Sequence, residues 1–175
     1  ELAEEAGLST GIISTARITH ATPGATYAHT AARDWEADSD RPAGATVPDI
    51  ASQLVDRFGK GGIGDGIEVV LGGGRAKFLP RSVKDPEDKG ATGARADGRS
   101  LVKEWTRKFR GGYVFDQKGF DAIDPASTDH LLGLFERTPR ARLVCSGREP
   151  QCRAHDEFGE LSHALDAIER AGGVL

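Results

Sequence analysis

The chain has 175 residues, of which 38% are hydrophobic and 29% charged, with 23 glycines and a formal net charge of −4. This composition indicates a globular, turn-rich protein of about one domain and excludes a disordered chain. The negative charge argues against a general nucleic-acid-binding surface. No apolar run approaches the roughly 20 residues that a membrane-spanning helix needs.

Hydrophobic spacing and turn residues predict the elements in chain order. Residues 2–6 favour a helix that ends at Gly7, and the β-branched run Gly11–Thr15 favours a buried strand. Thr22 before Pro23 is typical of a helix N-cap followed by proline at the first helical position. Further helices are expected at 48–58 and 100–109, and further strands at 67–71, 113–115 and 131–135. An acidic, turn-rich surface loop is expected at 36–46, a glycine-rich break at 59–66 and a polar, exposed loop at 81–98.

Strands that alternate with helices predict an α/β architecture with a mainly parallel central sheet and flanking helices. Both ends of the chain resemble interrupted elements. The chain begins at Glu1 as if in the middle of a helix and stops at Leu175 just after a glycine turn. We therefore expect an internal piece of a longer protein. Cys145 and Cys152 are compatible with a disulfide and equally with two free thiols.

The stretch 15–33 concentrates groups that bind ions. It contains several hydroxyls, the imidazoles of His20 and His29, and the guanidinium of Arg33. Hydroxyl and imidazole groups can ligate metal, and a guanidinium fork matches two phosphoryl oxygens. The stretch also leaves a strand at its carboxyl end, where open α/β sheets bind their ligands. Each residue has an ordinary alternative, namely a surface histidine, a capping threonine or a solvated arginine.

Several patches in one order resemble the bacterial-type alkaline phosphatases. In that family a Thr-(Thr/Ser)-Ala … (Asp/His)-Ala-(Thr/Ser)-Pro-Ala … Ala-His … Arg pattern follows the helix after the nucleophilic serine. The chain matches this pattern, and further patches of the family, at 14–16, 20–23, 28–29, 33–36, 49–54, 70–75, 97–99 and 131–136. The resemblance covers about residues 1–136 and implies part of an alkaline phosphatase-like three-layer fold.

The resemblance also implies site residues. Arg33 matches the arginine that holds two oxygens of the substrate phosphate, and Thr22 matches a hydroxyl ligand of the magnesium site. His20 matches a position beside that site and would act as an adjustable ligand or as a neighbour of the ligands. His29 has no role in the family, so a structural role is expected there.

The activity implied by the family is hydrolysis of phosphate monoesters through a phosphoserine, with two Zn²⁺ and one Mg²⁺ in the complete enzyme. Family members are usually periplasmic or secreted and usually form homodimers. The chain contains neither the Asp-Ser-Ala nucleophile motif nor the Asp-His-x-His zinc motif of the family. We therefore expect the longer protein to be the enzyme, the isolated chain to be inactive, and any magnesium site here to be partial.

Residues 137–175 depart from the family pattern. Arg137 to Arg153 is rich in arginine, and helical spacing returns only near 157–170. The domain prediction is therefore an internal catalytic segment at 1–136, followed by a divergent or frame-shifted tail at 137–175.

A different class of function remains open from the residues alone. The chain could be a free-standing α/β module that binds an anion without chemistry, using Arg33 and the turn Gly72–Arg75. Within the family, the same turn is more simply a tight connection between a strand and a helix. His130, His155 and His163 lack the spacing of a metal motif.

Overall fold

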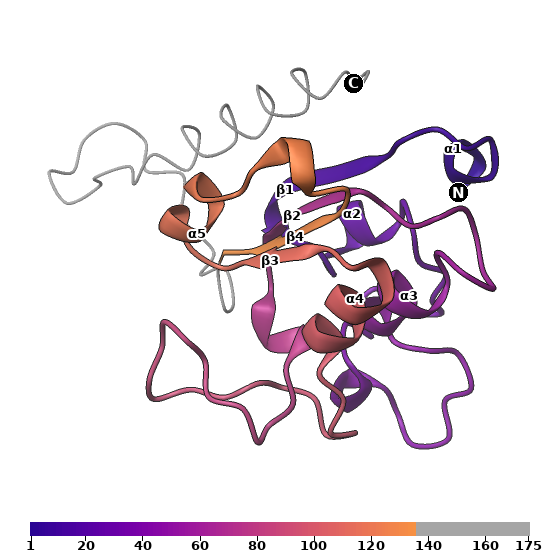
Figure 1. Cartoon of the computed structure of the whole chain (residues 1–175). Coiled ribbons are helices and arrows are strands. Elements are labelled where there is room, and N and C mark those ends of the chain that lie inside the picture. The colour runs from indigo at the N-terminus through magenta and orange to yellow at the C-terminus, as the bar shows by residue number, and fades with distance from the viewer. Residues whose placement is uncertain (136–175) are drawn as a thin grey trace, which may run out of the picture.

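The computed structural model describes residues 1–135, and at its centre is a four-stranded parallel sheet in the order β1-β2-β4-β3 (Figure 1). Its strands are β1 (Gly11–Arg17), β2 (Val69–Gly73), β3 (Gly112–Val114) and β4 (Leu131–Leu134). Each expected strand is present, with its ends moved by one or two residues, and the parallel α/β prediction is confirmed. The predicted helix at 157–170, both cysteines and the proposed tail lie outside the described residues.

The sheet separates two apolar clusters because successive side chains of a strand point to opposite faces. Val70 of β2 and Leu132 of β4 belong to the larger cluster, with Leu54 and Trp105. Their neighbours in sequence, among them Leu71, pack in the smaller cluster on the other face. Alternate residues of the same strands therefore form two cores.

Helices cover both faces of the sheet. They are α1 (Leu2–Glu5), α2 (Ala21–Gly24), α3 (Ile50–Asp56), α4 (Leu101–Phe109) and α5 (Gln117–Asp121), with short 3-10 turns η1 (Asp38–Asp40), η2 (Arg75–Phe78) and η3 (Pro125–Ser127). In Figure 1, α3 and α4 lie on one side of the sheet and α5 on the other. Helix α5, which was not predicted, has five residues and is capped by the Asp116 carboxylate, which accepts a hydrogen bond from Gly119 N at 2.8 Å.

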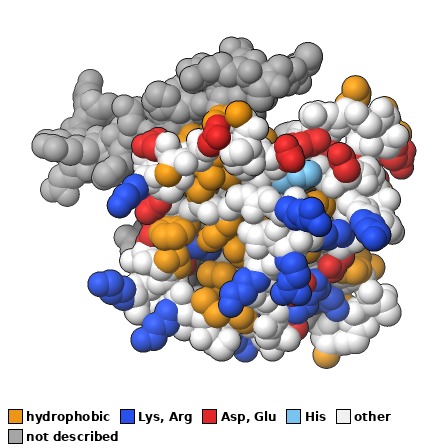
Figure 2. Space-filling model, viewed as in Figure 1, with side chains coloured by type: hydrophobic (Ala, Val, Ile, Leu, Met, Phe, Trp, Pro, Cys, Tyr) orange, Lys and Arg blue, Asp and Glu red, His pale blue; other side chains and the backbone are white. Residues whose placement is uncertain are grey.

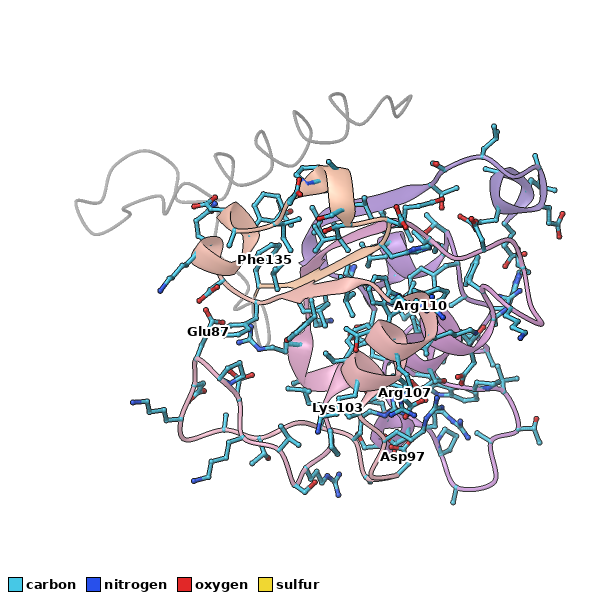
Figure 3. The ribbon with its side chains drawn as sticks, viewed as in Figure 1. Glu87, Asp97, Lys103, Arg107, Arg110 and Phe135 are labelled. Carbon is cyan, nitrogen blue, oxygen red and sulfur yellow. The ribbon has the colours of Figure 1, made fainter. Side chains whose placement is uncertain are left out.

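Helix α4 carries apolar side chains on one side and basic side chains on the other. Leu101, Val102 and Trp105 are buried against the larger cluster. Lys103 and Arg107, four residues apart, point away from the sheet (Figure 3). Basic side chains accordingly gather on this face of the molecule (Figure 2). Within residues 1–135, no helix combines the length and apolar character needed to cross a membrane.

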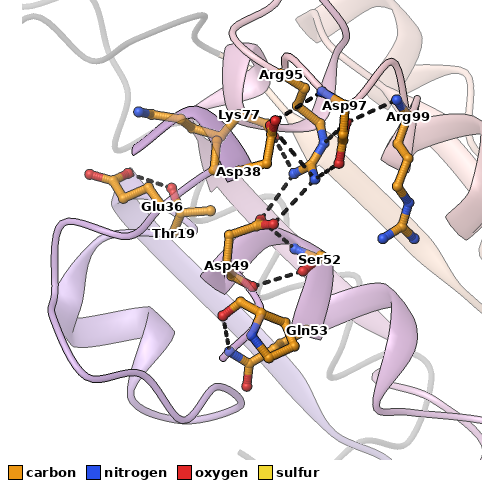
Figure 4. A network of polar contacts seen from close by, with 12 residues as sticks. Thr19, Glu36, Asp38, Asp49, Ser52, Gln53, Lys77, Arg95, Asp97 and Arg99 are labelled. Carbon is orange, nitrogen blue, oxygen red and sulfur yellow. Dashed lines mark hydrogen bonds and ion pairs between the residues drawn. The ribbon is translucent and has the colours of Figure 1, made fainter. Parts of the chain in front are cut away.

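The expected exposed loop at 81–98 is partly buried. The side chain of Arg95 is 0% exposed and donates to both carboxylate oxygens of Asp49, at 2.9 and 3.2 Å (Figure 4). Asp97 also accepts from Arg95. The prediction of an exposed loop was therefore wrong at Arg95 and at Asp85, because paired charges can be buried where single ones cannot.

Candidate functional site

The turn from β1 into α2 places the predicted site at the carboxyl edge of the sheet. After Arg17, the chain leaves β1 and turns, so that His20 becomes the N-cap of α2 with extended backbone angles. The expected N-cap Thr22 was wrong by two residues: Thr22 and Pro23 lie inside the first turn of the helix. Proline is tolerated there because the first four backbone N–H groups of a helix have no partner within it.

A buried tyrosine fixes α2 against the end of β1. Tyr27 is 0% exposed, and its hydroxyl donates to Ile18 O at 3.0 Å. Burial raises the pKa of Tyr27 well above its ordinary value, because the charged form would be cut off from water. The hydrogen bond to Ile18 O holds the segment just after α2 against the end of β1.

Arg33 and His20 come together at this edge although 13 residues separate them. Arg33 Nη2 lies 3.3 Å from His20 Nε2, a contact in which a neutral imidazole accepts from the guanidinium. Arg33 is exposed, and none of the carboxylates in residues 1–135 pairs with it. A hollow of about 400 Å³ beside it is lined by Ala21, Gly24, Ala25, Ala28, His29, Thr30, Arg33 and Ile50. The arrangement presents an un-neutralised cation to an open pocket.

Thr22 is exposed but is separate from this hollow. Its hydroxyl has no hydrogen-bond partner within residues 1–135, and it does not line the pocket. In the same part of the chain, no group of three or more His, Cys, Asp or Glu side chains is arranged to hold a metal ion. Magnesium usually takes six oxygen ligands, so these residues do not complete a metal site on their own. The Thr22 hydroxyl and the His20 ring are single donors that could belong to a larger one.

Arg75 differs from Arg33 in that its charge is fully compensated. Its side chain is 0% exposed and donates to both carboxylate oxygens of Asp85, at 3.0 and 2.9 Å. It also donates to Glu87 and to the carbonyls of Leu134 and Phe135, at the end of β4. Glu87 and Phe135 lie on the same side of the molecule in Figure 3. The turn after β2 therefore joins strand ends to a loop and does not offer Arg75 to an anion.

Glu36 follows Arg33 by three residues, and its burial was not predicted. It was expected at the start of an acidic surface loop, but it is 7% exposed. Its carboxylate accepts from Arg17 Nε and Nη2, both at 2.7 Å, and from Thr19 Oγ1 at 2.6 Å. Burial opposes ionisation of Glu36, but these hydrogen bonds outweigh it and hold its pKa below the ordinary value. The only hint of this burial in the sequence is that the two partners of Glu36, Arg17 and Thr19, stand at alternate positions at the end of a strand.

Comparison with known proteins decides the family. A family model described as alkaline phosphatase matches residues 1–142. The chain belongs to the alkaline phosphatase family. The family resemblance found in residues 1–136 is therefore confirmed.

The curated relatives are longer alkaline phosphatases. The chain is 43% identical over 144 residues to alkaline phosphatase from Gadus morhua, which covers 77% of the chain and 29% of the relative. It is 40% identical over 144 residues to the tissue-nonspecific isozyme of Gallus gallus, covering 77% of the chain and 27% of that protein. The chain thus spans less than a third of the length of these relatives.

A solved structure of a cold-active alkaline phosphatase from a psychrophilic Shewanella sp. is also similar. The TM-score is 0.45 at 24% identity, over 78% of the chain and 24% of that structure. The roles of Arg33, Thr22 and His20, and the bacterial branch within the family, stay predictions. His29, expected to be structural, has its ring Nε2 3.0 Å from Glu1 Oε1 and its backbone paired with Gln53.

Proposed function

We propose that this alkaline phosphatase chain is the phosphate-binding segment of an enzyme that hydrolyses phosphate monoesters through a phosphoserine. The observation that supports the proposal is that the charge of Arg33 is not neutralised by a carboxylate of residues 1–135. Among the arginines at the carboxyl edge of the sheet, Arg17 and Arg75 are neutralised by carboxylates, whereas Arg33 pairs with none in residues 1–135. An arginine that binds a substrate anion needs its charge free.

Arg33 would bind two non-bridging oxygens of the phosphoryl group through parallel N–H donors, the geometry that favours guanidinium over ammonium. His20 contacts one of its amino nitrogens from the side and, when neutral, leaves the positive charge in place. A guanidinium positioned against the equatorial oxygens stabilises the negative charge that is spread over them in the transition state, and so lowers the barrier to phosphoryl transfer.

The resemblance implies two Zn²⁺ and one Mg²⁺ in the complete enzyme. When bound, such ions activate the nucleophile and stabilise the leaving oxygen. Thr22 would give its unpartnered hydroxyl to the magnesium site, and His20 would lie beside that site or join its ligands. Because residues 1–135 lack a complete ligand cluster, we propose that the isolated chain is inactive.

The cellular setting of the complete enzyme is also a proposal. On the same resemblance, the enzyme would be periplasmic or secreted and would act as a homodimer. Size-exclusion chromatography with light scattering, and fractionation of the native host, would test the two statements separately.

The function is tested by assaying the complete gene product with p-nitrophenyl phosphate at alkaline pH, with and without added Zn²⁺ and Mg²⁺. We expect metal-dependent hydrolysis, and a loss of about 10²–10³-fold in kcat/KM for Arg33→Ala. The 175-residue chain is assayed in parallel and should show no turnover.

Other outcomes would contradict particular parts of the proposal. Hydrolysis that is unchanged in Arg33→Ala would refute the role of the arginine. Phosphate binding without any turnover of the complete product would instead favour the non-catalytic anion-binding module.

A further inference from the structure

Arg33 lies on the loop between α2 and η1, in a stretch (28–37) that forms neither helix nor strand. A long, exposed side chain on such a loop loses much conformational freedom when it binds a ligand. Binding is stronger when the backbone beneath the side chain is held in place beforehand. The hydrogen bonds of residues 29–36 show what holds it.

The start of the loop is held by the side-chain amide of Gln53, which is 3% exposed on α3. Gln53 Oε1 accepts from His29 N at 2.9 Å, and Gln53 Nε2 donates to His29 O at 2.9 Å. The second N–H of the same amide donates to Pro48 O, also at 2.9 Å. The amide thus pairs with both backbone groups of His29, four residues before Arg33.

The end of the loop is held by the first turn of the same helix. Ile50 N donates to Trp35 O at 2.9 Å, and Ala51 N donates to Glu36 O at 3.1 Å. These N–H groups have no acceptor within α3, so the loop carbonyls satisfy donors that would otherwise be unpaired. The side chain of Glu36 also ties this end of the loop to β1, because its carboxylate accepts hydrogen bonds from Arg17 and Thr19. Helix α3 therefore fixes the loop on both sides of Arg33.

We propose that Gln53 is a positioning residue for Arg33. It does not touch the phosphate; it fixes the backbone of His29 and thereby the origin of the Arg33 side chain. This inference rests on the proposed function, since it assigns Gln53 a part in binding the phosphoryl group.

The test is a double-mutant cycle in the complete gene product, with Gln53→Met, Arg33→Ala, the double variant, and Gln117→Met as a matched control. Gln117 lies on α5, on the opposite face of the sheet, and its amide contacts only Asp121 within the described residues. Methionine preserves the length of the side chain and removes all four side-chain hydrogen bonds of Gln53, the three to backbone groups and the one from Arg57.

Gln53→Met should lower kcat/KM for p-nitrophenyl phosphate by about 10- to 100-fold and raise the inhibition constant of inorganic phosphate, because small displacements of a binding group are costly. In the Arg33→Ala background, the same substitution should have little further effect, since the group that it positions is gone. Gln117→Met should match the wild type.

If Gln53→Met does not fold, as judged by thermal unfolding, Gln53→Glu takes its place in the cycle. It keeps the acceptor for His29 N, with Arg57 Nη1 3.5 Å from that oxygen, but loses both donors. Losses that multiply in the double variant would overturn the inference, because Gln53 would then act independently of Arg33. So would a Gln53 variant equal to Gln117→Met.

A complete product that turns over no substrate would count against the proposed function only. The same cycle is then measured by calorimetry with inorganic phosphate. Phosphate binding that weakens in Gln53→Met, and that is no weaker in the double variant than in Arg33→Ala, would support the inference. Absence of phosphate binding by the wild type would overturn both.

Discussion

The buried pair between Arg95 and Asp49 gives the sharpest prediction about stability. Both residues are almost fully buried, at 1% and 2% exposure, and Asp49 also caps α3 by accepting from Ser52 N at 2.9 Å. Arg95→Met keeps the length of the stem but leaves a buried carboxylate without its cation. Removal of one partner of a buried ion pair costs about 3–5 kcal/mol in the free energy of unfolding. For a chain of this size, that corresponds to a fall of roughly 6–20 °C in Tm.

Arg99→Met is the matched control. Arg99 pairs with Asp56 and Glu104, but its side chain is 33% exposed and solvent screens the charges. Its loss should cost about 0–1 kcal/mol. Differential scanning calorimetry and urea unfolding of both variants would give the comparison, and hydrogen exchange at Ser52 N would report on the start of α3.

A second substitution tests whether the loss comes from the unpaired charge of Asp49. Asp49→Asn in the Arg95→Met background removes the unpaired charge and keeps an oxygen that can cap the helix. The double variant should therefore be more stable than Arg95→Met alone. Equal losses for Arg95→Met and Arg99→Met, or no recovery in the double variant, would show that the Asp49 charge is not buried in solution.

Two further predictions concern Glu36 and the glycines of the loop before β2. The pKa of Glu36 is lowered on folding, so its contribution to stability is complete above the ordinary value of 4.5 and is lost as pH falls through the folded pKa. The difference in unfolding free energy between wild type and Glu36→Gln should thus stay level above about pH 4.5 and shrink as the pH falls below it, and a difference that stays constant in acid would contradict the assignment. Gly66 has φ 118°, and an added Cβ would lie 2.2 Å from Phe109 Cε1, whereas Gly61 has φ 86° and open space around it. Thermal unfolding should show a loss of about 1–2 kcal/mol for Gly61→Ala and about 1–3 kcal/mol more for Gly66→Ala, so equal losses would refute the packing argument.

Much of the fold could be predicted from local patterns. Runs of β-branched and apolar residues marked all four strands, and helical spacing marked α3 and α4, because both signals arise from residues close in sequence. The position of Arg33 after a strand end also followed from the sequence, since parallel sheets bind ligands at that edge. The short helix α5 was missed because five residues carry too little periodicity to be recognised.

The sequence by itself determined the strands, the main helices, the family and the candidate residues His20, Thr22 and Arg33. Tertiary structure alone decided which of them meet: His20 contacts Arg33, whereas within residues 1–135 the Thr22 hydroxyl forms no hydrogen bond with either of them. It also decided which charges are buried and what holds the loop. The bond between Gln53 and His29 spans 24 residues, and that between Arg95 and Asp49 spans 46. Pairs so distant leave no local pattern, because their partners become neighbours only when the chain packs around the sheet.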